Sequence, residues 1–211
     1  MKTCFATDFH IGGENNRPEL LALFDHLTAR PPDLLILGGD IGDPWEATWP
    51  EILASRPWQS LQKLVAKRTE LGLPTIWFPV NHDYGGKPEY LPGAQLATSY
   101  TVGKWVFMHG YEFSLDWGIG PIDNVAFWIA RHRPGLMVPI CHALFKTPAQ
   151  ALNHEAQSYR DKGNWQIETG HSRARQYAQK TGLNVAVGHF HTRTLEQGFF
   201  CDAGHNLGGT S

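Results

Sequence analysis

The sequence has few cysteines, no long apolar run and no excess of charge of either sign. Its three cysteines, Cys4, Cys141 and Cys201, lie far apart and form no Cys-x-x-Cys pair. A disulfide framework or a cysteine-based zinc site is therefore not expected, and a reducing compartment fits. No apolar run approaches the roughly 20 residues that cross a bilayer. The 18 basic and 20 acidic residues leave a formal charge of -2, which disfavours nucleic acid as the main partner.

What the sequence does have is the composition of an ordinary globular protein. The chain has 211 residues, of which 42% are hydrophobic and 18% charged. This length favours a single domain, 1–211, with a sizeable core. A candidate site residue, Asp8, follows the start of the chain so closely that no signal peptide fits before it. We therefore expect a cytoplasmic protein, and the composition leaves its oligomeric state open.

Apolar runs and helical periodicity alternate along the first half of the chain. Short apolar runs at 3–7, 34–37 and 75–78 predict buried strands, and helical periodicity over 18–27 and 61–71 separates them. This order predicts an α/β fold with a parallel sheet and right-handed crossovers. The segment between Pro44 and Pro57 is expected to be loop-like with a short helix. Later strands are expected at 96–100 and 105–108, which form a hairpin, at 184–187, and in a closing hairpin within 194–202.

Residues 111–182 are too many for a simple crossover and predict a helical lid inserted in the domain. Helical patterns lie near 122–131, 148–160 and 172–180. Apolar residues and arginines alternate in this segment. They predict either a chamber with cationic clamps for a lipid- or nucleotide-containing substrate, or helices that only pack on the core. The sequence leaves both interpretations open.

Ligand-type side chains follow five of the predicted strands. They are Asp8, His10, Asp40, Asp43, Asn81, His82, Asp83, His109, His189 and His191. Ligands bind at the carboxyl ends of strands in open α/β sheets, and mixed carboxylate and imidazole ligands suit manganese, iron, cobalt, nickel or zinc. Each motif alone has a simpler explanation: the stretches at Asp40 and Asn81 could form turns, the histidine pair could be exposed or hydrogen-bonded, and Asp8-Phe9-His10 could arise by chance. Their recurrence after five strands favours a metal centre.

Two of these motifs place polar residues two positions apart. In Asp8-Phe9-His10 and His189-Phe190-His191, an extended strand end would point both polar side chains to one side. The phenylalanine between them would then face the opposite side and pack in the core. Each pair is therefore predicted to reach one pocket.

Taken together, these motifs resemble the calcineurin-like metallophosphoesterase family. The family pattern is DxH, GDxxD, GNH[DE], a histidine before glycine, and GHxH. The matching segments here are Asp8–His10, Gly39–Asp43, Val80–Asp83, His109–Gly110 and Gly188–His191. Val80 stands where glycine is usual, which a negative φ at that position would allow. The layout of the inserted segment also resembles the UDP-2,3-diacylglucosamine pyrophosphate hydrolase branch.

The resemblance implies a layered α/β/β/α sandwich with a helical insertion and two divalent transition metal ions, with manganese the first choice. One ion would be held by Asp8, His10, Asp40 and His191, and the other by Asp40, Asn81, His109 and His189. Asp43 and Asp83 would orient these ligands. His82 would not bind metal and would act as a general acid or stabilise charge.

The activity implied is hydrolysis of a phosphodiester, phosphomonoester or pyrophosphate bond by a metal-activated hydroxide. The substrate would be a small phosphate ester, with nucleotide- and lipid-containing esters among the candidates, and His205 is a candidate contact to it. The alternative is a catalytically silent scaffold that keeps this fold to bind other proteins. All the motif positions are filled, which favours an enzyme.

Overall fold

The computed structural model describes residues 1–12, 17–83, 85–113, 165–190, 194–196 and 200–202. Their strands form a four-stranded and a five-stranded sheet. In the four-stranded sheet all neighbours run parallel, in the order β1 (Thr3–Ala6), β2 (Leu34–Leu37), β3 (Thr75–Trp77) and β4 (Ala94–Leu96). Their carboxyl ends therefore meet along one edge of the sheet.

The five-stranded sheet is mixed. Its order is β5 (Ser99–Val102), β6 (Trp105–Met108), β7 (Asn184–Val187), β9 (Phe200–Asp202) and β8 (Thr194–Glu196). β6, β7 and β9 run parallel to one another, while β5 and β8 pair antiparallel with β6 and β9. The segments after β6 and β7 therefore leave this sheet at the same end.

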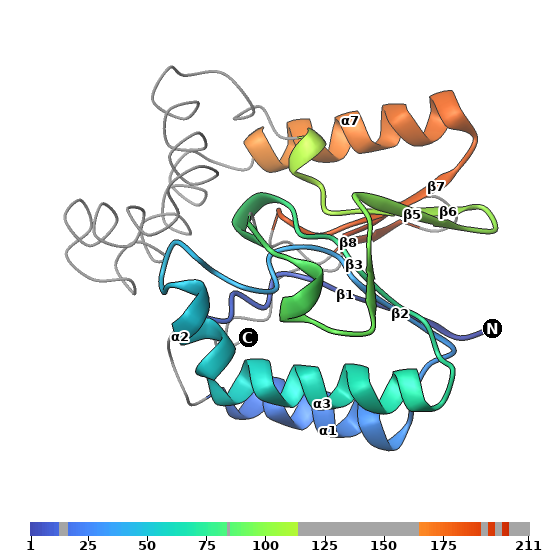
Figure 1. The fold of residues 1–211 in the computed structure, drawn as a ribbon. Coiled ribbons are helices and arrows are strands. Elements are labelled where there is room, and N and C mark those ends of the chain that lie inside the picture. The colour runs from blue at the N-terminus through green and yellow to red at the C-terminus, as the bar shows by residue number, and fades with distance from the viewer. Residues whose placement is uncertain (13–16, 84, 114–164, 191–193, 197–199, 203–211) are drawn as a thin grey trace.

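Helices cover the outer face of each sheet, so that the molecule has four layers (Figure 1). The helices α1 (Pro18–Ala29) and α3 (Arg56–Glu70) pack beside each other on the four-stranded sheet, and α7 (Trp165–Thr181) packs on the five-stranded one. The shorter elements are α2 (Trp49–Ala54) and the 3-10 turns η1 (Asn81–Asp83), η2 (Pro88–Tyr90) and η3 (Tyr111–Phe113). This layering agrees with the predicted α/β/β/α sandwich.

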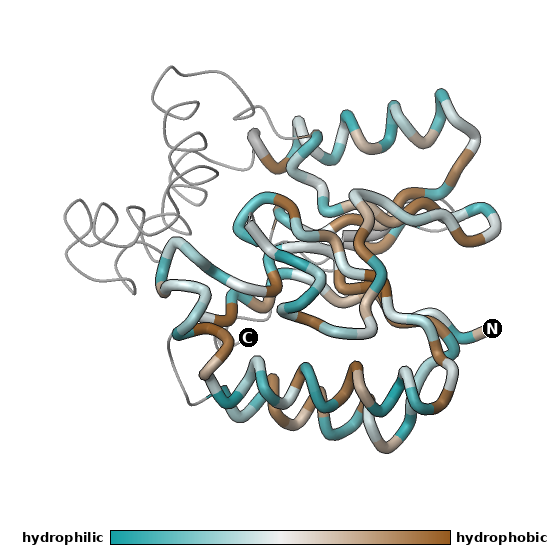
Figure 2. The backbone as a smooth tube through the Cα atoms, in the orientation of Figure 1, coloured by the Kyte–Doolittle hydropathy of each residue, from teal (hydrophilic) through white to brown (hydrophobic). Residues whose placement is uncertain are grey.

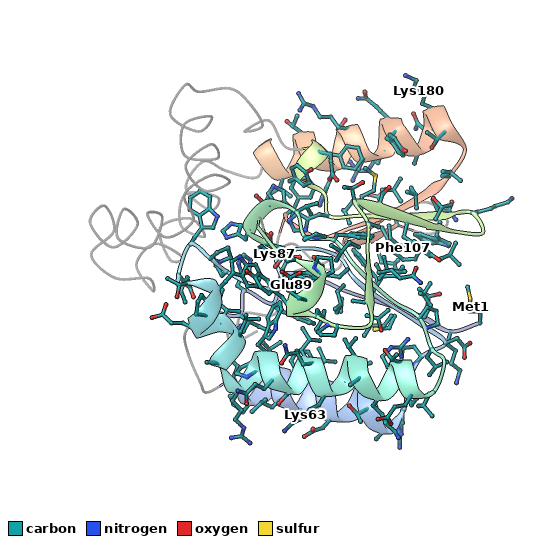
Figure 3. The ribbon with its side chains drawn as sticks, viewed as in Figure 1. Met1, Lys63, Lys87, Glu89, Phe107 and Lys180 are labelled. Carbon is teal, nitrogen blue, oxygen red and sulfur yellow. The ribbon has the colours of Figure 1, made fainter. Side chains whose placement is uncertain are left out.

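The alternation of side chains along β2 explains the layers. Leu35 and Leu37 pack against the helices, whereas Leu34 and Ile36 pack between the two sheets. Apolar segments accordingly run through the strands in the middle of the molecule (Figure 2). Phe107 lies between the sheets, while Lys63 and Lys180 project outward from the helical layers (Figure 3). Burial on both faces is why β2 reads as a continuous apolar run.

The structure confirms the predicted strands 34–37 and 184–187, the first two α/β crossovers and the closing hairpin of β8 and β9. The predicted hairpin is confirmed, with β6 at 105–108 paired antiparallel with β5. The bounds of the predicted strand 96–100 are wrong. Its first part belongs to β4 in one sheet and its second part to β5 in the other, because the chain crosses between the sheets there. The helix predicted over 61–71 begins earlier, at Arg56, where the Ser55 side chain accepts the N–H of Trp58.

Much of the predicted lid lies outside the described residues. The helices expected near 122–131 and 148–160 fall there, while the helix expected at 172–180 is part of α7. Among the residues that the structure describes, no helix is long and apolar enough to cross a membrane.

Candidate metal centre

An unusual backbone conformation marks the candidate site. In the described part of the chain, the non-glycine residues with positive φ are Asp8, His10, Asp40, Asn81 and His189, at 46° to 67°. Left-handed backbone is unfavourable for most residues, is enriched in Asp, Asn and His, and gathers at functional sites. Each of the five is a residue that the sequence predicted for the metal centre.

This conformation corrects the reasoning about Asp8-Phe9-His10. The strand β1 ends at Ala6, so the motif is a loop in which Asp8 and His10 are left-handed, and not an extended strand end. Phe9 still packs into the core beneath it, with its ring centroid 5.5 Å from that of Phe24. Val80 is not among the described residues with positive φ. This agrees with the negative φ that a valine in place of the usual glycine was expected to need.

Hydrogen bonds between loops stabilise these conformations. The N–H of Asp8 donates to Gly39 O at 3.0 Å, and the N–H of His10 donates to Asp40 O at 2.8 Å. The Arg17 guanidinium donates to the carbonyl oxygens that follow Asp8, at 3.0 Å to Phe9 and 3.3 Å to His10. The loops after β1 and β2 are thus joined side by side, which brings their polar side chains together.

The first group of possible ligands comes from the four-stranded sheet. One ligand atom each from His10, Asp40 and His82 lies within 4.8 Å of the others, and all three residues are buried. Asp43 lies behind the two rings, with Oδ2 3.1 Å from His10 Nδ1 and Oδ1 3.1 Å from His82 Nδ1. Because Asp43 engages Nδ1 of each ring, Nε2 is the nitrogen of each ring that lies away from Asp43, and His10 Nε2 is 3.8 Å from Asp40 Oδ2.

The second group joins the two sheets. It consists of Asp40, His109 and His189, whose ligand atoms also lie within 4.8 Å of one another. His109 Nε2 is 3.1 Å from Asp40 Oδ2, and its Nδ1 lies 2.9 Å from the carbonyl oxygen of Gly38, to which it can donate. Asp40 is therefore common to both groups.

Asn81 lies at the centre of the second group. Its amide nitrogen donates to Asp40 Oδ2 at 3.1 Å and lies 3.3 Å from a ring nitrogen of each of His109 and His189. The nitrogen and oxygen of a side-chain amide exchange places by rotation about one bond. Asn81 therefore offers an oxygen ligand at the point where the three other side chains meet.

The pocket favours positive charge. Burial alone would raise the pKa of Asp40, but His109, His82 and His10 outweigh burial and hold that pKa well below its ordinary value. Burial alone would lower the pKa of His109, yet Asp40 and, more weakly, Asp8 raise it to about 9. The carboxylates thus attract a cation or, in its place, a proton on His109.

Asp83 connects the loop that carries Asp40 to the loop after β3. Its carboxylate accepts hydrogen bonds from the N–H groups of Ile41 and Gly42 and, at 3.2 Å, from the indole of Trp77. Burial raises the pKa of Asp83 to about 8 although three N–H groups donate to it. It lies behind the pocket and contacts backbone rather than the histidines.

Two glycines allow the ligand-type side chains to approach the backbone closely. A Cβ at Gly39 would lie 2.8 Å from His109 Nδ1, and one at Gly188 would lie 2.3 Å from Asp8 Oδ2. Contacts below 3.0 Å are not tolerated, so larger residues at either position would displace these side chains. The chain is shaped to bring carboxylate and imidazole groups together, which is the donor set that divalent transition metals prefer.

Nine of the ten predicted site residues are described, and they gather at one end of the two sheets. Asp8 belongs to neither three-residue group, and its carboxylate accepts the N–H of His189 at 3.0 Å. His191 and His205 lie outside the described residues.

The sequence did not single out two residues that contact the site. Thr7 donates through Oγ1 to Gly39 O at 3.0 Å, and the Glu112 carboxylate accepts the N–H of Gly110 at 2.9 Å. Their closeness in sequence to Asp8 and His109 was the available signal.

A family model of the calcineurin-like phosphoesterases matches residues 1–193. Together with the fold and the pocket, this match shows that the chain belongs to the calcineurin-like phosphoesterase family. A comparison with curated proteins gave no match. Divalent metal ions are typical of the family, and the buried His/Asp groups fit such ions.

Proposed function

We propose that the protein is a phosphoester hydrolase that uses two divalent transition metal ions, with manganese the first choice. The observation that carries the proposal is the position of Asp40, which belongs to both groups of possible ligands. A carboxylate shared in this way is suited to bridge two cations. The surrounding histidines and Asn81 supply the neutral ligands that the remaining positions need.

The ligands divide between the two ions as follows. Asp8, His10, Asp40 and His191 would hold one ion, and Asp40, Asn81, His109 and His189 would hold the other. When bound, the two ions supply Lewis acidity, which lowers the pKa of water to give a nucleophile near neutral pH. Asp43 and Asp83 would fix the loops and rings around them, as their contacts with His10 and with Ile41 and Gly42 suggest.

His82 is the residue that would act on the substrate. Its backbone N–H donates to Asp40 Oδ1 at 2.9 Å and its Nδ1 lies against Asp43, so the ring has a fixed orientation. Nε2 is then the atom that can donate to a phosphoryl oxygen or give a proton to the leaving oxygen. Either interaction would reduce the charge that develops as the ester bond breaks.

The substrate would be a small phosphodiester, phosphomonoester or pyrophosphate, and compounds with a nucleotide or lipid part are candidates. The composition gives nucleic acid little support as a partner, and a cytoplasmic location remains a prediction. The domain boundaries, with one domain over 1–211 and a lid over 111–182, also remain predictions, as does a contact between His205 and the substrate.

A substrate panel with the metal varied tests this function. Monoester, diester, cyclic nucleotide and nucleotide–lipid pyrophosphate substrates would be assayed with manganese, cobalt, nickel and zinc. We expect metal-dependent turnover of at least one class, and bis(p-nitrophenyl) phosphate with manganese is the first assay. His82→Gln should lower kcat by about a hundredfold or more while metal content is retained. Metal-loaded protein without turnover of any class would favour the scaffold alternative.

A further inference from the structure

We propose that Trp45 forms an aromatic subsite for a planar ring on the substrate, directly beside the phosphate position. The inference rests on the proposed function, because it places the phosphate next to His82. The ligand class is an ester or phosphonate whose ring is joined to phosphorus through one or two bonds, such as an aryl group. The subsite lies between β2 and α2, outside both groups of possible metal ligands.

The first observation is the contact between the two rings. The centroid of the Trp45 indole lies 5.4 Å from that of His82, and the ring planes are inclined by 34°. Among the described residues, the His82 ring also contacts His10, which meets it edge-on at 4.8 Å. Trp45 is half-buried, whereas His82 and His10 are buried. The indole thus borders the pocket and keeps part of its surface accessible.

The second observation is that one carboxylate oxygen contacts both residues. Asp43 Oδ1 accepts the backbone N–H of Trp45 at 3.1 Å and lies 3.1 Å from His82 Nδ1. The turn that carries Trp45 is also fixed by the N–H groups of Glu46 and Ala47, which donate to Asp43 O at 3.0 and 3.2 Å. The backbone of Trp45 is therefore fixed relative to the His82 ring, and the ring contact places the indole beside it.

These contacts give the pocket a flat apolar surface next to a polar one. A substrate whose phosphoryl group meets His82 Nε2 would carry its leaving group within reach of the indole. Aromatic rings stack on a preformed indole more favourably than alkyl groups do, with geometry contributing beyond the area buried. The subsite would therefore select aryl over alkyl esters.

Binding of two non-hydrolysable phosphonates tests the subsite without relying on turnover. Phenylphosphonate and methylphosphonate would be titrated into manganese-loaded protein by calorimetry. We expect wild type to bind the phenyl compound about fivefold or more tightly than the methyl compound. Trp45→Leu should remove this preference and leave methylphosphonate affinity unchanged, while Trp45→Phe should keep most of it.

Trp105→Leu is the matched control. Trp105 is also half-buried, but it lies on β6 and lines a separate cavity with Phe5 and Val102. It should leave the phenyl preference intact. A phenyl preference absent from wild type, or equal in wild type and Trp45→Leu, would overturn the subsite. A Trp45→Leu protein that binds both phosphonates more weakly by the same factor would do so too, since Trp45 would then only support the fold. These results are independent of whether the substrate panel shows turnover, so the two proposals fail separately.

Discussion

Asp40 on one sheet and His109 on the other meet with 3.1 Å between carboxylate oxygen and imidazole nitrogen. Asp40 follows β2 of the parallel sheet, and His109 follows β6 of the mixed sheet. The candidate metal centre therefore lies across the junction of the two sheets. The geometry of the centre therefore depends on how the two sheets pack against each other.

The shared position of Asp40 predicts how metal content responds to substitution. Wild type should retain about two ions per chain after dialysis against manganese. Asp40→Asn should weaken both sites together, because one carboxylate serves both groups. His10→Gln and His189→Gln should each remove about one ion, since each ring belongs to one group. Elemental analysis measures the content, and His26→Gln, at an exposed position on α1, is the control. Loss of only one ion in Asp40→Asn would contradict the bridge.

Removal of metal should destabilise the protein as well as inactivate it. The carboxylates of Asp40 and Asp8 lie beside His109 and raise its pKa, so the pocket is stabilised by a bound positive charge. Saturation at about a hundredfold above Kd corresponds to about 2.7 kcal/mol of stabilisation. Exhaustive chelation should therefore lower Tm by roughly 5–10 °C. Differential scanning calorimetry with and without chelator measures the shift, and readdition of manganese should restore it. An unchanged Tm would show that the pocket does not bind the ion tightly.

Gly170 on α7 is predicted to position the second group of ligands. A Cβ at this residue would lie 2.2 Å from the ring of Phe190, which follows His189 directly. Alanine favours helix by about 1 kcal/mol over glycine, but the clash is with a buried ring and should cost about 1–3 kcal/mol. Gly170→Ala should therefore lower the free energy of unfolding and weaken one metal site more than the other.

Urea denaturation and metal titration measure the two effects of Gly170→Ala. Gln176→Ala, at an exposed position on the same helix, should change neither. A Gly170→Ala protein more stable than wild type, with unaltered metal affinity, would show that the ring moves without cost.

Arg68 is predicted to be the most sensitive charged residue outside the site. Its side chain is 1% exposed and donates to Thr75 Oγ1 at 3.0 Å, to Pro32 O at 2.9 Å and to Pro74 O at 2.7 Å. Arg68→Met would leave the buried Thr75 Oγ1 and Pro32 O without this donor, whereas Pro74 O still accepts the N–H of Leu35, so we expect a loss of about 3 kcal/mol. Lys63→Met, at an exposed position on the same helix, should stay within about 0.5 kcal/mol. Urea denaturation measures the free energy of unfolding of both variants. Equal values for Arg68→Met and Lys63→Met would contradict the stabilising role of Arg68.

The pair of Arg175 and Glu196 predicts a small dependence of stability on pH. Arg175 Nε lies 3.0 Å from both carboxylate oxygens of Glu196, and this hydrogen bond lowers the pKa of Glu196 below its ordinary value. A pKa lowered in the folded state gives stability above the unfolded pKa, which is lost as pH falls through the folded pKa. Because the pair is partly exposed, Glu196→Gln should cost only about 0.5 kcal/mol at pH 7. Urea denaturation should show this difference shrinking below about pH 4, and a difference that grows there would contradict the assignment.

The fold was predictable where local pattern and tertiary packing agree. The run Leu34–Leu37 reads as a buried strand because both its faces are covered. The segment 96–100 was misassigned because nothing local marks the point where the chain leaves β4 for β5. Ser55 and Pro57 mark the true start of α3. The helix was predicted to begin too late because the apolar pattern starts only at Leu61.

The sequence by itself determined which residues have the chemistry for a metal centre, since carboxylate and imidazole groups follow strand after strand at motif spacings. Only the tertiary structure decided which of them lie together, for example that His82 and not Asp8 lies with His10 and Asp40. It also gave Asp8, His10, Asp40, Asn81 and His189 their left-handed backbone and placed Trp45 against His82. The physical reason is that these relations depend on two sheets packing with their carboxyl ends at one edge. That packing is fixed by contacts between residues far apart in the chain.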